Sequence, residues 1–119
     1  MLETYARREA VVIVAVTVAD GRVGHGLGRA ETVAVADVRD GKVQDWTEVD
    51  VHWGALHDIG SEGEHHARIV RFFREHHIER VVAGGAGAGM RQTMAKMGVT
   101  VLTDLSGDAR AAAVAAVEA

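Results

Sequence analysis

The sequence of 119 residues contains no cysteine and no proline. Without cysteine the chain can form no disulfide, and it cannot hold zinc or an iron–sulfur cluster through thiolate ligands. Any bound metal would therefore need histidine, carboxylate, methionine or backbone ligands. Without proline, the breaks between helices and strands must come from the 14 glycines.

Long apolar runs and a strong positive charge are also missing. No apolar run approaches the length of a membrane span, and the first ten residues are too mixed and charged for a signal peptide. The formal net charge is −4 and the arginines are scattered, which argues against a nucleic-acid groove. We therefore expect one cytoplasmic domain over residues 1–119, with no nucleic-acid or membrane partner, in which residues 1–9 are candidates for disorder.

The first half of the chain has the patterns of three strands. Residues 10–19 are β-branched and apolar on both faces, which predicts a strand in the middle of a sheet. The glycine-rich segment 20–29 is expected to contain no regular element. Residues 32–38 and 43–49 are predicted strands, and the Asp-Gly pair of "RDGK" between them is a strong hairpin signal.

The second half alternates helices with short strands. A loop of about a dozen residues, long enough to suggest function, leads to Ser61 and Glu64, whose spacing is that of a capping box at the start of a helix over 62–77. A second helix carries Met90, Met94 and Met97 on one side and ends at Gly98. The other predicted elements are strands at 80–83 and 99–103 and a final helix at 109–117.

This order of elements predicts an α/β domain. We expect a ribonuclease H-like three-layer fold, with a mixed five-stranded sheet in the order 3-2-1-4-5 and helices on both faces. The C-terminal ends of expected strands one, three, four and five would then share one edge, where open α/β sheets bind ligands. The third strand would be the outermost strand of the sheet, and its unpaired backbone groups could pair with a second copy of the chain to form a homodimer.

Histidines gather at this predicted edge. A neutral imidazole is the form that binds metals, and the partial positive charge of a helix N-terminus favours that form. Histidines in polar loops are also commonly plain surface residues, and the spacing here matches no known zinc pattern, so both interpretations stay open. The candidate metal ligands are five of the seven histidines: His25, His52, His57, His65 and His66.

The segment "GGAGAGM", residues 84–90, precedes the second helix. Its backbone N–H groups could bind an anion at the start of that helix, and a tight turn that needs small residues is an equal interpretation. It matches neither the Walker pattern nor G-x-G-x-x-G. No Ser-His-Asp or paired-carboxylate arrangement is visible, and the first strand lacks the carboxylate that a two-metal nuclease needs, so we expect no enzyme activity.

Three segments resemble the dinitrogenase iron–molybdenum cofactor biosynthesis family. They are "DGRVGHGLGRAETVAVADVRDGKV", "HHARIVRFFREHHIERVVAGG" and "GAGMRQTMAKMGVTVL", and the resemblance covers about residues 11–117. In the "HFG-x-A" segment of that family the histidine aligns with Gly26, and Leu27 takes the place of the aromatic residue. His25, one position earlier, is the candidate to replace the missing ligand.

The resemblance implies a non-catalytic carrier that is accessory to nitrogenase in nitrogen fixation. Such a carrier would hold an iron–molybdenum or iron–sulfur cluster in a pocket at the sheet edge and exchange it with a cofactor-assembly or acceptor protein. The alternative is a metal-free domain that binds a small anionic ligand or a partner protein at the same edge. The residues expected to bind the cofactor are Gly26, Gly28, Arg29, Gly84, Gly85, Gly87, Gly89 and Met90.

Overall fold

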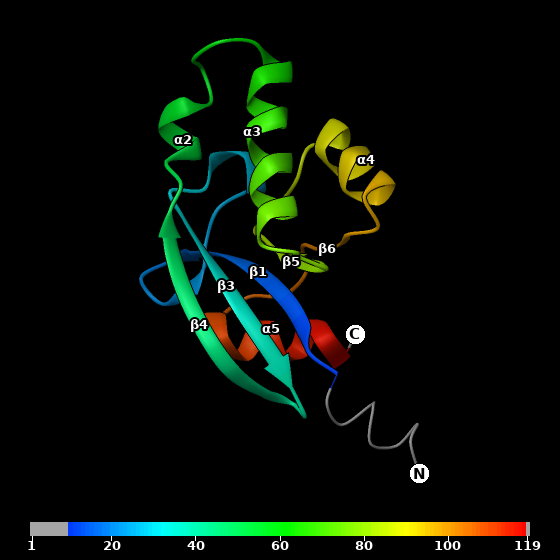
Figure 1. Ribbon diagram of the computed structural model, residues 1–119. Coiled ribbons are helices and arrows are strands. Elements are labelled where there is room, and N and C mark those ends of the chain that lie inside the picture. The colour runs from blue at the N-terminus through cyan, green and yellow to red at the C-terminus, as the bar shows by residue number, and fades with distance from the viewer. Residues whose placement is uncertain (1–9, 119) are drawn as a thin grey trace.

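The computed structural model describes residues 10–118, so the expectation for residues 1–9 lies outside the described chain. A single mixed sheet has helices on both of its faces (Figure 1). The strands are β1 (Val12–Ala19), β2 (Arg22–Val23), β3 (Thr32–Arg39), β4 (Lys42–Asp50), β5 (Arg80–Val82) and β6 (Thr100–Leu102). The helices are η1 (Leu27–Arg29), α2 (Trp53–Leu56), α3 (Glu62–Glu75), α4 (Ala88–Lys96) and α5 (Ala109–Glu118).

The sheet has six strands, one more than expected, and the α/β class with a mixed sheet is confirmed. Its main path runs β4-β3-β1-β5-β6, and β2 pairs with β1 beside this path. Strand β1 is antiparallel to β3 and parallel to β5, while β3 is antiparallel to β4 and β5 is parallel to β6. Strand β1 takes a central place because its side chains are apolar on both faces.

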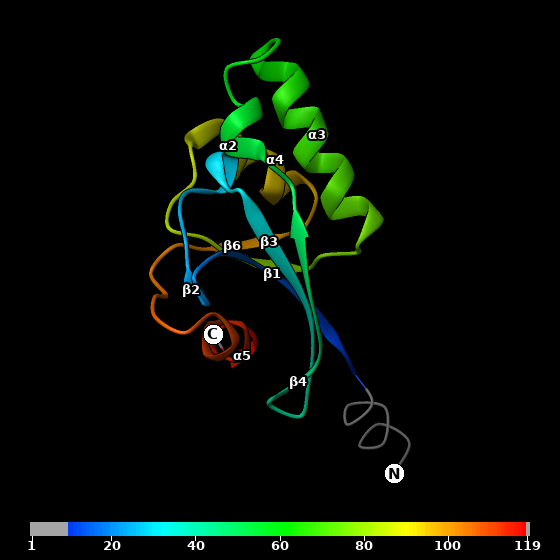
Figure 2. The ribbon, with the colours of Figure 1, turned by 90° about the vertical axis from the view of Figure 1, so that its left-hand side faces the viewer.

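Two apolar cores lie on opposite faces of the sheet, and Figures 1 and 2 show α3 and α4 on one face and α5 on the other. Ala15 of β1 belongs to the core under α2, α3 and α4, in which Trp53 and Phe73 are the largest buried side chains. Val14 and Val16 belong to the core on the other face, which is covered by α5. The period-two alternation of side chains along β1 therefore supplies both layers.

The glycine-rich segment 20–29 contains two regular elements, contrary to expectation. Asp20 and Gly21 have φ values of 52° and 75°, close to those of Asp40 and Gly41 at the β3–β4 turn, 52° and 70°. Both pairs make the tight turn that favours a hairpin, so the chain folds back after β1 and forms β2. The short helix η1 follows in the same segment.

The loop before α3 also holds an unexpected helix, α2, whose Trp53 side chain is buried. The start of α3 is as predicted, because the Ser61 hydroxyl accepts a hydrogen bond of 3.1 Å from the Glu64 backbone N–H. The helix ends at Glu75, two residues earlier than expected. Among residues 10–118, no helix is both long and apolar enough to cross a membrane.

Substitution of Ala113 tests the packing of α5 on the sheet. Ala113 is fully buried in the core of that face, so Ala113→Leu should lower the free energy of unfolding by about 1–3 kcal/mol through overpacking. Ala111→Leu makes the same change at an exposed position of the same helix, and urea unfolding should show little effect. Equal losses in the two variants would contradict this arrangement of α5.

Candidate functional site

The loops that follow β1, β4, β5 and β6 emerge at one edge of the sheet. Strands β1, β5 and β6 run parallel, and β4 runs in the same direction because β1 and β4 are each antiparallel to β3. Two of these loops join through their backbones. The Gly84 N–H donates to the His25 carbonyl at 3.0 Å, and the Leu27 N–H donates to the Gly85 carbonyl at 2.9 Å.

Glycine at position 84 is required by this contact between loops. A Cβ atom there would collide with the Gly24 carbonyl oxygen and lie 3.2 Å from the His25 carbonyl carbon, and both are backbone atoms. Gly85 and Gly87 differ, because a Cβ at either position would meet no atom within 4 Å. Packing therefore explains why position 84 is a glycine. At Gly85 and Gly87 the missing side chain leaves open space instead.

A cavity of about 210 Å³ lies between the first turns of α3 and α4, beside η1 and the end of α2. We call it the rim cavity, and its lining consists of Gly28, His57, Glu62, His65, His66, Gly87, Ala88, Gly89 and Met90. His57 also lines two neighbouring cavities. One, of about 500 Å³, includes Asp58 and Gly60, and the other, of about 210 Å³, includes Gly26, Arg29 and Gly85.

The structure brings three of the five candidate histidines together. The rings of His57 and His65 meet edge to face, with centroids 5.1 Å apart and an interplanar angle of 73°. His66 lines the same cavity, and its Nε2 lies 3.9 Å from the Glu62 carboxylate. These histidines come from the end of α2 and the first turn of α3, so a short helix and the start of a long one carry the group.

His65 is buried, and both of its ring nitrogens have partners. Its Nε2 lies 2.8 Å from the Gly28 carbonyl oxygen, and its Nδ1 lies 2.8 Å from Nη1 of Arg68. The His57 Nδ1 lies 3.1 Å from the Asp58 carboxylate, while its side chain stays 36% exposed. The three clustered histidines therefore differ in how many ring nitrogens stay available.

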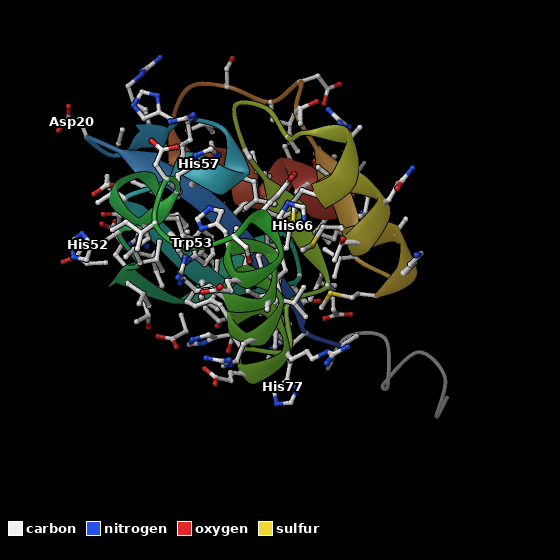
Figure 3. All side chains as sticks on the ribbon, turned by 90° about the horizontal axis from the view of Figure 1, so that it is seen from above. Asp20, His52, Trp53, His57, His66 and His77 are labelled. Carbon is white, nitrogen blue, oxygen red and sulfur yellow. The ribbon has the colours of Figure 1, made fainter. Side chains whose placement is uncertain are left out.

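The other two candidate histidines lie apart from the rim cavity. His52 has its Nδ1 3.4 Å from the Glu31 carboxylate, and its side chain is 63% exposed. His25 lines a separate cavity of about 450 Å³ together with Asp20 and Glu48. Figure 3 shows His52 to the side of His57 and His66, and His77 at the far end of α3.

The predicted cofactor-binding residues also divide. Gly28, Gly87, Gly89 and Met90 line the rim cavity, and Gly26, Arg29 and Gly85 line the adjoining cavity with His57. Gly84 lines neither cavity and has the packing role described above.

Three further residues of the site were not predicted from the sequence: Asp58, Glu62 and Arg68. Glu62 lies four positions before His66, and Arg68 lies three positions after His65. This helical spacing was visible in the sequence once a helix starting at residue 62 had been predicted.

The chemistry of the cavity combines imidazole with backbone N–H groups. The N–H groups in the first turn of a helix have no partner inside the helix and attract negative charge. Here that turn belongs to α4, and Gly87, Ala88 and Gly89 line the cavity. Within residues 10–118 no group of three or more His, Asp or Glu side chains is placed to hold a metal ion. The first turn of α4 therefore offers amide groups to an anionic guest, and the Glu62 carboxylate also lines the cavity.

The carboxyl group of Asp58 has a pKa below its ordinary value. The main cause is its hydrogen bond with His57, to which the charge of the same imidazole adds. Asp58 is fully exposed, so this pair acts on the ionisation of the carboxyl group more than on the stability of the fold.

A family model described as "Dinitrogenase iron-molybdenum cofactor" matches residues 10–119 of the chain. Three solved structures are similar in fold. PH0822 is 19% identical over 89% of both chains, with a TM-score of 0.67. A Thermotoga protein, TM1290, provisionally named as a NifB protein of the DUF35 family, is 22% identical over 90% of this chain and 88% of its own, with a TM-score of 0.63.

The third structure is a protein of Methanocaldococcus jannaschii, mj0327, provisionally named as a dinitrogenase. It is 7% identical over 83% of this chain and 81% of its own, with a TM-score of 0.59. No curated protein sequence matches the chain. At these identities the three structures show a shared fold and nothing finer.

Substitution of Gly84 tests the contact between the two glycine-rich loops. Gly84→Ala should lower the free energy of unfolding by about 1–3 kcal/mol, because the new methyl group meets backbone atoms that cannot turn aside. Gly85→Ala is the matched control, since a methyl group there meets open space. Urea unfolding of both variants gives the comparison, and a loss in the Gly85 variant as large as that in the Gly84 variant would disprove the assignment.

Substitution of His57 tests the origin of the Asp58 pKa. His57→Ala should raise the pKa of the Asp58 carboxyl group toward its ordinary value, because the hydrogen bond and the charge of the imidazole are both lost. A titration followed by carboxyl ¹³C NMR measures this shift. His52 pairs with Glu31 instead, so His52→Ala should leave the pKa of the Asp58 carboxyl group unchanged.

Proposed function

The chain belongs to the dinitrogenase iron–molybdenum cofactor family, and from this membership we propose that it is a non-catalytic carrier in cofactor biosynthesis. Its cargo is an iron–sulfur or iron–molybdenum cluster, or a precursor of one, held in the rim cavity. The observation that supports this proposal is the convergence of His57 and His66 with the amide groups at the start of α4 around one cavity. The proposal assigns no ligand role to His25 and His52, because neither lines this cavity.

The donor atoms of the cavity fit a cargo that is held and released. Among residues 10–118 the His57 Nε2 has no hydrogen-bond partner, and the His66 Nε2 is too far from Glu62 for a hydrogen bond. Imidazole is a suitable ligand for iron, whereas thiolate is the usual ligand of iron–sulfur clusters. Two imidazoles without thiolate should hold a cluster less firmly than a cysteine site would, which suits a carrier.

The backbone of the cavity complements the charge of such a cargo. Cluster sulfides carry negative charge and accept hydrogen bonds, and the first turn of α4 offers N–H groups at Ala88 and Gly89. The open space beside Gly87 leaves room for a guest to approach these amides. His57 and His66 stay 36% and 29% exposed, so a partner protein can reach the guest at the mouth of the cavity.

Several wider expectations belong to the same proposal. We infer a ribonuclease H-like fold from the order of elements and the sheet path. We also propose a cytoplasmic location, a role in nitrogen fixation and exchange of the cargo with a cofactor-assembly or acceptor protein. A homodimer through β4 would have to overcome the repulsion of Asp45, Glu48 and Asp50 on that edge strand.

The metal-free alternative also has an observation in its favour. No group of three or more metal-ligating side chains comes together among residues 10–118, while the amide groups and Arg29 are suited to a small anion. Under this alternative the chain would bind an anionic ligand or a partner at the same cavity and would hold no iron. Measurement of bound iron separates the two functions.

Removal of both proposed ligands tests the carrier function. Protein reconstituted anaerobically with ferrous iron and sulfide should retain iron, and His57→Ala combined with His66→Ala should lower retention by at least about tenfold. The matched control combines His52→Ala with His77→Ala, which removes two histidines outside the cavity and should retain iron like the unmodified chain. Iron analysis and the visible absorption spectrum provide the readouts.

Two results would count against the carrier function. Unmodified protein that holds no iron after anaerobic reconstitution would favour the metal-free alternative. Equal retention by the cavity variant and the control variant would show that iron binds elsewhere on the chain.

A further inference from the structure

His65 is an unusual side chain for the interior of this protein. Among residues 10–118 only Thr17 and His65 are buried polar or charged residues, and His65 is 4% exposed. A buried polar side chain is stable only when its hydrogen-bonding groups are satisfied. Thr17 meets this need by donating to the His25 carbonyl, within the segment that follows β1. His65 meets it with partners from two different elements.

The partners of His65 determine which nitrogen carries the proton. A carbonyl oxygen can only accept, so the Nε2 that faces Gly28 must donate. A guanidinium group can only donate, so the Nδ1 that faces Arg68 must accept. Both contacts are 2.8 Å long. His65 is therefore in the neutral Nε2–H form, and no lone pair remains on its ring for a metal.

His65 connects three parts of the rim cavity. Its hydrogen bond to Gly28 ties α3 to η1, and its ring supports His57 from the end of α2 through the edge-to-face contact. The loop that contains Gly28 is tied in turn to the β5–α4 loop, because the Leu27 N–H donates to the Gly85 carbonyl. The wall of the cavity therefore depends on one imidazole that cannot itself bind the guest.

We propose that His65 is a positioning residue of the rim cavity, which fixes the Gly28 carbonyl and the His57 ring so that His57 and His66 can share one cargo. The effect of His65 on cargo binding rests on the proposed carrier function, but the contacts of His65 do not depend on any metal. Under this proposal two adjacent histidines have different roles that the sequence alone does not distinguish. His66 is a ligand of the cargo, and His65 holds the ligands in position. Outer-shell partners of this kind typically change metal affinity by about 10- to 100-fold when removed.

The first measurement concerns the metal-free protein. Long-range ¹H–¹⁵N NMR of the imidazoles, at a pH where free histidine is neutral, should show the Nε2–H form for His65. His65→Ala should shift the amide signals of Gly28 and the ring signals of His57, whereas His77→Ala, at the far end of α3, should leave both in place. The Nδ1–H form, a charged ring, or unchanged signals in the His65 variant would overturn the proposal.

The second measurement concerns binding and uses His65→Gln as the conservative variant. The glutamine side chain can donate to the Gly28 carbonyl but offers no imidazole. After anaerobic reconstitution with ferrous iron and sulfide, His65→Ala should bind iron about 10- to 100-fold more weakly than the unmodified chain, and His65→Gln should recover a large part of the loss. If glutamine restores neither iron nor the Gly28 signals while the protein stays folded, His65 does not act through this hydrogen bond.

A third variant covers the case in which His65→Ala does not fold. Arg68→Met removes the guanidinium donor and leaves the bond to Gly28 available. It should leave His65 in the Nε2–H form and the Gly28 amide signal in place, because the Gly28 carbonyl still accepts from Nε2, and an Nδ1–H form or a shifted Gly28 signal would contradict this hydrogen bond. If unmodified protein holds no iron, the carrier function fails, while the tautomer and the Gly28 signals still decide the role of His65.

Discussion

The close approach of two glycine-rich loops is the constraint on which the candidate site depends. Backbone N–H groups of Gly84 and Leu27 donate across this contact in opposite directions, and Gly84 has no room for a side chain. Backbone-to-backbone contact of this kind fixes loop positions more firmly than contacts between side chains, because fewer torsions can relax. The two loops that lead into η1 and α4, beside the rim cavity, are therefore held together by the fold itself.

The sheet makes this contact possible by sending its loops to one edge. Strands β1 and β5 are parallel neighbours, so the segments that follow them begin side by side. The end of β1 is carried back by the Asp20–Gly21 turn and then forward again into η1, which places Gly28 over the start of α3. Apolar cores cover both faces of the central strand β1. The polar groups of the candidate site therefore lie where the strands end and their loops begin.

The sequence predicts the long helices and strands well, misses β2, η1 and α2, and predicts the site only in part. Clear local signals, such as the Ser61 cap, the Asp-Gly turn at residue 41 and Gly98 with its φ of 76°, describe interactions between near neighbours in the chain. Which histidines line the rim cavity, and which of their ring nitrogens stay available, depends instead on contacts between segments that are distant in the chain. Nothing near His65 in the sequence indicates that the Gly28 carbonyl, 37 positions earlier, takes up one of its nitrogens.

The same limitation explains why the five candidate histidines do not all lie at one cavity. His25 and His52 lie on the correct edge of the sheet, but their side chains lie in a different cavity or pair with Glu31. Position along an edge can be inferred from topology, whereas the direction of a side chain depends on the backbone torsions of the loop. His52 shows this directly, since its φ of 55° is a left-handed conformation that no pattern of apolar residues predicts.

Under the proposed function the two ligand histidines are not equivalent. The carboxylate of Asp58 is hydrogen-bonded to the Nδ1 of His57, which orients that ring and makes its other nitrogen a better electron donor. Glu62, at 3.9 Å from His66, is too far away to fix the second ring in the same way. One ligand is thus held and the other can adjust, so a cluster could stay attached through His57 while His66 releases it to a partner at the open mouth of the cavity.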